Sequence, residues 1–162
     1  MNEKIPAAHS RTVMAQMALP DQANPAGNVH GGEMMKIMDN TAYVVAQKHC
    51  HMNNVTAAVD QITFHNPAYV GNLITSYGEL IYTSNSSMLI SVTINVEDLE
   101  KREENCALTA YFVMVAIGKN GKAAKIPQLE LNDEMAIAKY EEGKKIYEGI
   151  KSRPRVCWLP FK

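Results

Sequence analysis

Apolar residues recur every three or four positions from Gly32 to about His49, which is the spacing of one face of an α-helix. The members of this stripe are Met34, Met35, Met38, Ala42, Val45 and Ala46. The opposite positions are of mixed polarity rather than strongly charged. The pattern therefore predicts a long helix that is largely buried.

Five further segments are predicted to be strands. Four have an apolar and β-branched composition, and the fifth has the cleanest alternation of apolar and polar residues. The four are Arg11–Leu19, Val55–Phe64, Gly71–Tyr82 and Cys106–Ile117. In the fifth, residues 87–96, apolar residues face one side and mostly Ser, Thr and Asn the other, with Leu89 as the exception. Residues 83–86 form a polar turn, which indicates a hairpin, and Asp98–Asn105 is predicted to be a charged loop.

The order of these elements is a strand, a long helix and then four strands, which we expect to form a meander. It predicts an α+β fold in which one antiparallel sheet wraps around a central helix. We place this domain at residues 8–128, followed at 129–162 by a C-terminal helix and a tail. The helix, Asp133–Ile150, is amphipathic and largely exposed, and the tail carries Trp158 and Phe161, which could dock on the body or on a partner.

An open sheet edge is a second consequence of this arrangement. Pairing the edges of two copies would satisfy it, so we expect a homodimer.

Composition narrows the function classes. A net charge of −1 argues against a nucleic-acid partner. The three cysteines are odd in number and widely spaced, which argues against a disulfide framework or a CxxC zinc site and fits a reduced, cytoplasmic setting. No apolar run approaches the roughly 18 residues that span a membrane, and residues 1–10 lack the apolar core of a signal peptide.

The start of the long helix offers the first candidate chemistry. Gly31 and Gly32 leave the first backbone N–H groups of the helix accessible, and such donors can polarise a carbonyl and stabilise an oxyanion. Alternatively, the two glycines only permit a tight turn. His30 before them fits a capping or packing role better than that of a base. Asn24 could position water or donate to the oxyanion, although Asn followed by Pro is also a common turn.

Asp39 is the second candidate. It belongs to the apolar stripe of the helix, where a carboxylate is either paired or functional. It could act as a general base for water, as a nucleophile on a thioester or ester, or as a structural aspartate. Seven residues separate it from Gly32, which is roughly 10 Å along a helix. Because both groups must reach one carbonyl carbon, they fit poorly in one site of one chain. If both are catalytic, the sites lie between the two chains of a dimer.

Two other chemistries are disfavoured. His49, Cys50 and His51 resemble metal ligands, but adjacent residues at a helix end diverge, so we expect no metal. Ser87 lacks the G-x-S-x-G context of a serine hydrolase.

Several segments, in their order and spacing, resemble the acyl-CoA hydrolases of the hotdog fold, a group that includes hexameric bacterial enzymes and the brain-type cytosolic acyl-CoA hydrolase. The resemblance covers about residues 11–150 and is carried by residues 24–32, 38–39, 55–60, 64–67, 71–72, 82–88, 126–129 and 140–144. It implies dimers with one continuous sheet, assembled as trimers of dimers, and sites between subunits.

The resemblance also implies roles for individual residues. Asp39 would be the general base or nucleophile, Asn24 its partner from the other subunit, and the N–H near Gly32 would polarise the thioester carbonyl. Residues expected to contact the substrate or to border the CoA nucleotide are His30, Gly31, Thr56, Thr83, Ser84, Ser87, Lys101 and Arg102. By itself, the Lys101–Arg102 pair is more typical of a solvated loop.

The predicted function is hydrolysis of fatty acyl-CoA to free acid and CoA, with no cofactor beyond the CoA of the substrate. Attack by water and an anhydride intermediate on Asp39 both remain open. The alternatives are a hotdog hydratase or dehydratase, and a non-catalytic acyl-CoA sensor. The sensor is disfavoured because no DNA-binding segment precedes Arg11 and the chain is not basic.

Overall fold

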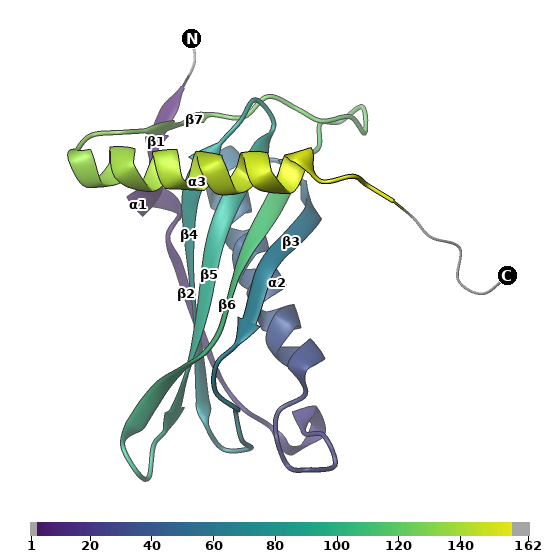
Figure 1. Cartoon of the computed structure of the whole chain (residues 1–162), viewed down its shortest axis with the longest axis vertical. Coiled ribbons are helices and arrows are strands. Elements are labelled where there is room, and N and C mark those ends of the chain that lie inside the picture. The colour runs from purple at the N-terminus through teal and green to yellow at the C-terminus, as the bar shows by residue number, and fades with distance from the viewer. Residues whose placement is uncertain (1–2, 157–162) are drawn as a thin grey trace, which may run out of the picture.

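A five-stranded antiparallel sheet packs around helix α2 (Gly31–Cys50) in the computed structural model, which describes residues 3–156 (Figure 1). Helix α2 contacts every strand of this sheet. The strands lie in the order β2 (Thr12–Met17), β4 (Leu73–Thr83), β5 (Ser87–Asp98), β6 (Glu103–Ala116) and β3 (Asn54–Phe64). The α+β architecture with a central helix is therefore confirmed.

The predicted four-strand meander is wrong, because β3 pairs with β6 instead of β4. Only β4, β5 and β6 follow one another through hairpins. The connection from β3 to β4, residues 65–72, packs against the segment before α2, where the Val29 N–H donates to the Ala68 carbonyl at 2.8 Å. It carries the chain from one edge of the sheet toward the other, and β3 becomes an edge strand that pairs only with β6 among residues 3–156.

Sequence patterns missed several short elements at the two ends of the domain. β1 (Lys4–Pro6) pairs in parallel with β7 (Gln128–Glu130), and α1 (Ala7–Ser10) and a 3-10 turn (Pro20–Gln22) flank β2. Three-residue strands carry too little periodicity to be recognised. The domain boundary predicted at residue 128 falls inside β7.

The charged loop predicted at Asp98–Asn105 is shorter than expected, because β6 already begins at Glu103. Its charged residues extend an exposed hairpin in which Asp98 pairs with Glu103. The turn is left with residues 99–102.

Helix α2 and β5 supply the centre of the core, as their apolar periodicity predicts. Met38, Ala42, Val45 and Ala46 are fully buried, and so are Met88, Ile90, Val92 and Ile94 of β5. Leu89, the exception to the alternation, is also fully buried, because it faces the other side of the sheet and packs with Val113 and Tyr147.

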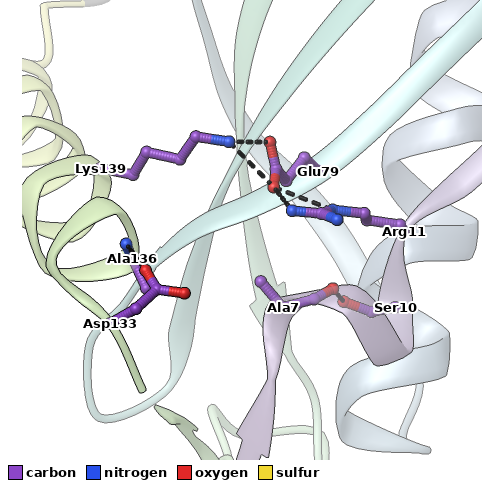
Figure 2. A network of polar contacts seen from close by, with 7 residues as sticks. All are labelled: Ala7, Ser10, Arg11, Glu79, Asp133, Ala136 and Lys139. Atoms are coloured by element: carbon purple, nitrogen blue, oxygen red, sulfur yellow. Dashed lines mark hydrogen bonds and ion pairs between the residues drawn. The ribbon is translucent and has the colours of Figure 1, made fainter. Parts of the chain in front are cut away.

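Helix α3 (Glu134–Ser152) crosses the face of the sheet opposite α2 (Figure 1). Its Tyr140 and Tyr147 rings lie about 5 Å from that of Tyr82, with centroids at 5.0 and 5.1 Å. An ion-pair network fixes its start: Glu79 accepts from Arg11 at 2.7 Å and from Lys139 at 3.0 Å, as Figure 2 shows. The junction between α1 and β2, strand β4 and helix α3 are thereby joined through one carboxylate.

The predicted docking of Trp158 and Phe161 lies outside the described residues, as does Cys157. Cys50 and Cys106 do not form a disulfide. Among the helices within residues 3–156, none has the length and apolar character needed to cross a membrane.

Candidate active site

A cleft of about 340 Å³ opens where the loop before α2 meets the end of β3. Asn24, Gly31, Met34 and the Phe64 ring are among its walls. The Asn24 side-chain oxygen accepts from the backbone N–H groups of Ala26 and Asn28, at 3.0 and 3.2 Å, and so shapes the loop. Its side-chain NH₂ has no partner within residues 3–156, which leaves a donor at the cleft. The structural and functional interpretations of Asn24 are therefore compatible.

His30 caps α2, as expected. Its Nδ1 accepts from the Gly32 N–H at 3.0 Å, so the amide predicted to polarise a carbonyl is already engaged. The Gly31 N–H has no partner within the described part of the chain, and Gly31 lines the cleft beside Asn24. A Cβ at Gly31 would come within 3.3 Å of the Phe64 ring. Gly31 is thus the better-placed donor at this end of the helix.

Asp39 lies two turns further along α2, half-buried, where it meets the edge strand β3. Its carboxylate accepts a hydrogen bond of 2.6 Å from the Thr56 hydroxyl. Thr56 was expected to contact substrate only by resemblance, and its bond to Asp39 has no signal in the sequence because 17 residues and a change of element separate the two.

The two candidate centres do not meet within one chain. Asp39 is not among the residues that line the Asn24–Gly31 cleft in residues 3–156. The seven-residue step from Gly32 to Asp39 lies within one continuous helix, which corresponds to roughly 10 Å along its axis. The spacing inferred from the sequence is therefore preserved in three dimensions.

The residues expected around the CoA nucleotide occupy opposite ends of β5. Thr83 ends β4, Ser84 lies in the β4–β5 turn and Ser87 begins β5, whereas Lys101 and Arg102 belong to the β5–β6 turn. A strand of this length spans roughly 35 Å. Thr83 is buried and donates to Gln128 at 3.2 Å, which is a structural role, and Lys101 pairs with Asp98 at 3.4 Å. One protomer does not bring these two groups together.

A larger cavity of about 580 Å³ lies beside the β4–β5 turn, between β3 and the C-terminal end of α3. Its walls include the predicted Ser84 and Ser87. They also include four residues that were not predicted, Tyr147, Lys151, Arg153 and Arg155. Lys151, Arg153 and Arg155 lie within five residues of the sequence and form a basic cluster, which is the signal that could have pointed to this cavity.

The histidines near the end of α2 diverge, as expected. His49 is fully buried and its Nε2 lies 3.0 Å from the Pro127 carbonyl oxygen, whereas His51 is exposed in a left-handed conformation that ends the helix. Burial lowers the pKa of His49, so its neutral form is favoured. Residues 3–156 contain no group of three His, Cys, Asp or Glu side chains able to share a metal ion.

Comparison with known proteins places this geometry in a family. Residues 26–102 match the model of the thioesterase superfamily. Protein VdlD of Helicobacter pylori is 35% identical over 135 residues, which cover 83% of this chain and 77% of VdlD. The chain belongs to the thioesterase superfamily.

Other members of the superfamily are similar over most of this chain. The cytosolic acyl coenzyme A thioester hydrolase of Rattus norvegicus is 37% identical over 150 residues, but these cover 90% of this chain and only 39% of the rat protein. The crystal structure of an apo-hexameric acyl-CoA thioesterase superposes with a TM-score of 0.88 at 28% identity, over 96% of this chain and 99% of that chain. The predicted hotdog fold and the resemblance to acyl-CoA hydrolases are thus confirmed.

Proposed function

We propose that this protein is a thioesterase that hydrolyses fatty acyl-CoA to free fatty acid and CoA. The observation that carries the proposal is the half-buried Asp39 carboxylate, held by Thr56 on the helix that the sheet surrounds. The names of the rat hydrolase and of the superposed hexameric structure support acyl-CoA as the substrate class.

The catalytic unit is a homodimer with two composite sites. The unpaired edge strand β3 offers a surface on which two sheets can join. Asn24 and Gly31 lie near one end of α2 and Asp39 near its middle, so each chain contributes half of a site to its partner. The hexameric state named for the superposed structure supports further assembly as a trimer of dimers.

Each half-site has one chemical task. The Gly31 N–H, with the Asn24 amide nearby, polarises the thioester carbonyl and stabilises the oxyanion. Asp39 of the other protomer removes a proton from the attacking water. When the tetrahedral intermediate collapses, the C–S bond breaks and the proton on Asp39 passes to the departing CoA sulfur. An anhydride between Asp39 and the acyl group is the second route. Single-turnover hydrolysis in ¹⁸O water tests it: direct attack by water labels only the product acid, whereas label in the Asp39 carboxylate indicates an anhydride opened at its aspartyl carbonyl.

The reaction as proposed needs no metal or redox cofactor, and CoA enters only as part of the substrate. The word cytosolic in the name of the rat relative supports a cytoplasmic location.

The test is a panel of acyl-CoA esters of increasing chain length, with thiol release followed by a thiol reagent. We expect turnover by the wild-type protein and a fall in kcat of at least ~10²-fold for Asp39→Ala. Glu142→Ala, an exposed change on α3, is the matched control. Thiol release that Asp39→Ala leaves unchanged would remove Asp39 from the mechanism.

The same panel separates the alternatives. Change of the acyl chain without thiol release would indicate a hydratase or dehydratase. Binding of acyl-CoA without any reaction would indicate a sensor.

A further inference from the structure

The loop before α2 places two asparagines opposite each other at the cleft of the candidate active site. The Asn24 N–H donates to the Asn28 carbonyl at 2.7 Å, and Ala23 and Val29 form an antiparallel bridge beside this pair. Gly27, with a φ of 87°, closes the loop between them. Residues opposite each other in an antiparallel pair direct their side chains to the same face, with Cβ atoms about 5 Å apart. Both asparagines line the cleft, so one ligand can contact both side chains.

The two side-chain amides offer different groups to a ligand. The Asn24 oxygen already accepts from two backbone N–H groups, at 3.0 and 3.2 Å, so only its NH₂ group is available. The half-buried Asn28 side chain has no hydrogen-bond partner within residues 3–156. Its oxygen and its NH₂ group are therefore both available. Asn28 supplies the acceptor that Asn24 lacks.

The backbone holds Asn28 in place without using its side chain. Its N–H donates to the Asn24 side-chain oxygen, its carbonyl accepts from the Asn24 N–H, and it forms a second bridge with Tyr69. The next residue, Val29, is buried in the core, and its N–H donates to the Ala68 carbonyl at 2.8 Å. These bonds would all remain if the Asn28 side chain were shortened. The amide is thus placed precisely at the cleft but is not needed to build the loop.

The proposed mechanism requires an acceptor of this kind. The attacking water aims one lone pair at the thioester carbonyl carbon, and Asp39 of the other protomer takes one of its two protons. The second proton needs an acceptor if the water is to be held in one orientation. Of the three groups that form the opposite half-site, Gly31 and Asn24 offer donors, whereas Asn28 offers a free oxygen.

We propose that Asn28 positions the attacking water, because its side-chain oxygen accepts a hydrogen bond from the proton that Asp39 does not take. The inference rests on the proposed function and adds a residue to it. Held from two sides, the water keeps its lone pair directed at the carbonyl carbon, and such alignment lowers the barrier to attack. No covalent bond to Asn28 forms or breaks. The proton that it orients stays on the water oxygen and becomes the hydroxyl proton of the product acid.

The first test compares two substitutions that separate the acceptor from the donor. Asn28→Ala removes both groups and should lower kcat ~10-fold or more, with KM nearly unchanged. Asn28→Asp keeps an acceptor oxygen of the same reach and removes the NH₂ group, so kcat should stay within about threefold of wild type. Asn132→Ala, at an exposed asparagine that does not line the cleft, is the control. Thermal unfolding checks that all three variants fold.

Two results of this comparison would overturn the inference. An Asn28→Asp variant as slow as Asn28→Ala would assign the role to the NH₂ group. An Asn28→Ala variant as fast as the control would leave Asn28 without a role in the reaction. In both cases hydrolysis by the wild-type protein would leave the proposed function standing, whereas absence of hydrolysis in the wild type would overturn both proposals.

Heterodimers provide a measurement that a purely structural role of Asn28 would not explain. Chains with Asn28→Ala and with Asp39→Ala, combined in one dimer, form one intact site and should have about half of the wild-type activity. Chains with Asn28→Ala and with Asn24→Ala form no intact site, since both residues belong to the same half-site, and should have about a twentieth or less. If the first heterodimer were as slow as the second, Asn28 would not act opposite Asp39.

Discussion

The Thr56 hydroxyl donates a 2.6 Å hydrogen bond to the Asp39 carboxylate and so joins the middle of α2 to the edge strand β3. A hydrogen bond to a charged group contributes about 1.5–3 kcal/mol. It fixes the direction of the carboxylate at the point where, in the proposed mechanism, the attacking water must be held.

Replacement of Thr56 should therefore lower the rate rather than substrate affinity. Thr56→Val keeps the shape of the side chain and removes the donor, so we expect kcat to fall ~10-fold or more, with KM nearly unchanged. Thr56→Ser retains the hydroxyl and should restore most of kcat. Steady-state kinetics of the three proteins checks this, and a serine variant as slow as the valine variant would contradict the positioning role.

Composite sites predict complementation between two inactive variants. A heterodimer of Asp39→Ala and Asn24→Ala chains contains one site with both residues intact and one site with neither. Co-expressed with two affinity tags and purified through both, it should retain about half of the wild-type activity per dimer. Each homodimer alone should be inactive. If both residues acted within one chain, the heterodimer would also be inactive.

The Glu79 network predicts a stability difference that depends on pH. Burial, the largest influence, opposes ionisation of Glu79, but the hydrogen bonds and charges of Lys139 and Arg11 outweigh it and lower the pKa. A carboxylate whose pKa is lower in the folded state stabilises the protein above its unfolded value of 4.5, and this contribution is lost as pH falls through the folded pKa.

Glu79→Gln should accordingly lower the free energy of unfolding by about 1 kcal/mol at pH 7 and by progressively less below pH 4.5. Urea unfolding across this pH range measures the difference. Glu142→Gln, exposed on α3, is the control and should have little effect at any pH. If the difference in the free energy of unfolding between Glu79→Gln and the wild-type protein grew as the pH fell, the predicted direction would be contradicted.

Two glycines predict opposite effects of the same substitution. A Cβ at Gly78 would lie 2.7 Å from Val45 Cγ2 and 2.9 Å from Thr41 Cγ2, so Gly78→Ala would push β4 away from α2 and should destabilise by ~1–3 kcal/mol. A Cβ at Gly149 on α3 meets nothing within 4 Å, so Gly149→Ala should stabilise by up to about 1 kcal/mol. Thermal unfolding of the two variants should shift in opposite directions.

Periodicity alone located the long elements. The predicted helix from Gly32 to about His49 corresponds to α2, and the predicted strands overlap β2 to β6, because burial of one face imposes a repeat of 3.6 or 2 residues. Strand order was not accessible in the same way. The position of β3 depends on how the connection at residues 65–72 packs against the segment before α2. That packing uses backbone hydrogen bonds, which leave no pattern of residue types in the sequence.

At the candidate site, the sequence by itself determined which groups are present and how far apart they must lie. Gly32 and Asp39 are seven residues apart, and the fixed rise of a helix makes that separation about 10 Å in any fold that keeps the helix. This distance alone pointed to a shared site between two chains.

Only the tertiary structure decided which atoms are free to act. It engages the Gly32 N–H with His30, leaves that of Gly31 without a partner among the residues described, and brings Thr56 to Asp39. It also separates Lys101 and Arg102 from the turn 84–87 and brings Lys151 and Arg155 to that turn instead. Such contacts join residues that are distant in the chain, and they follow from the packing of whole elements, which local sequence does not encode.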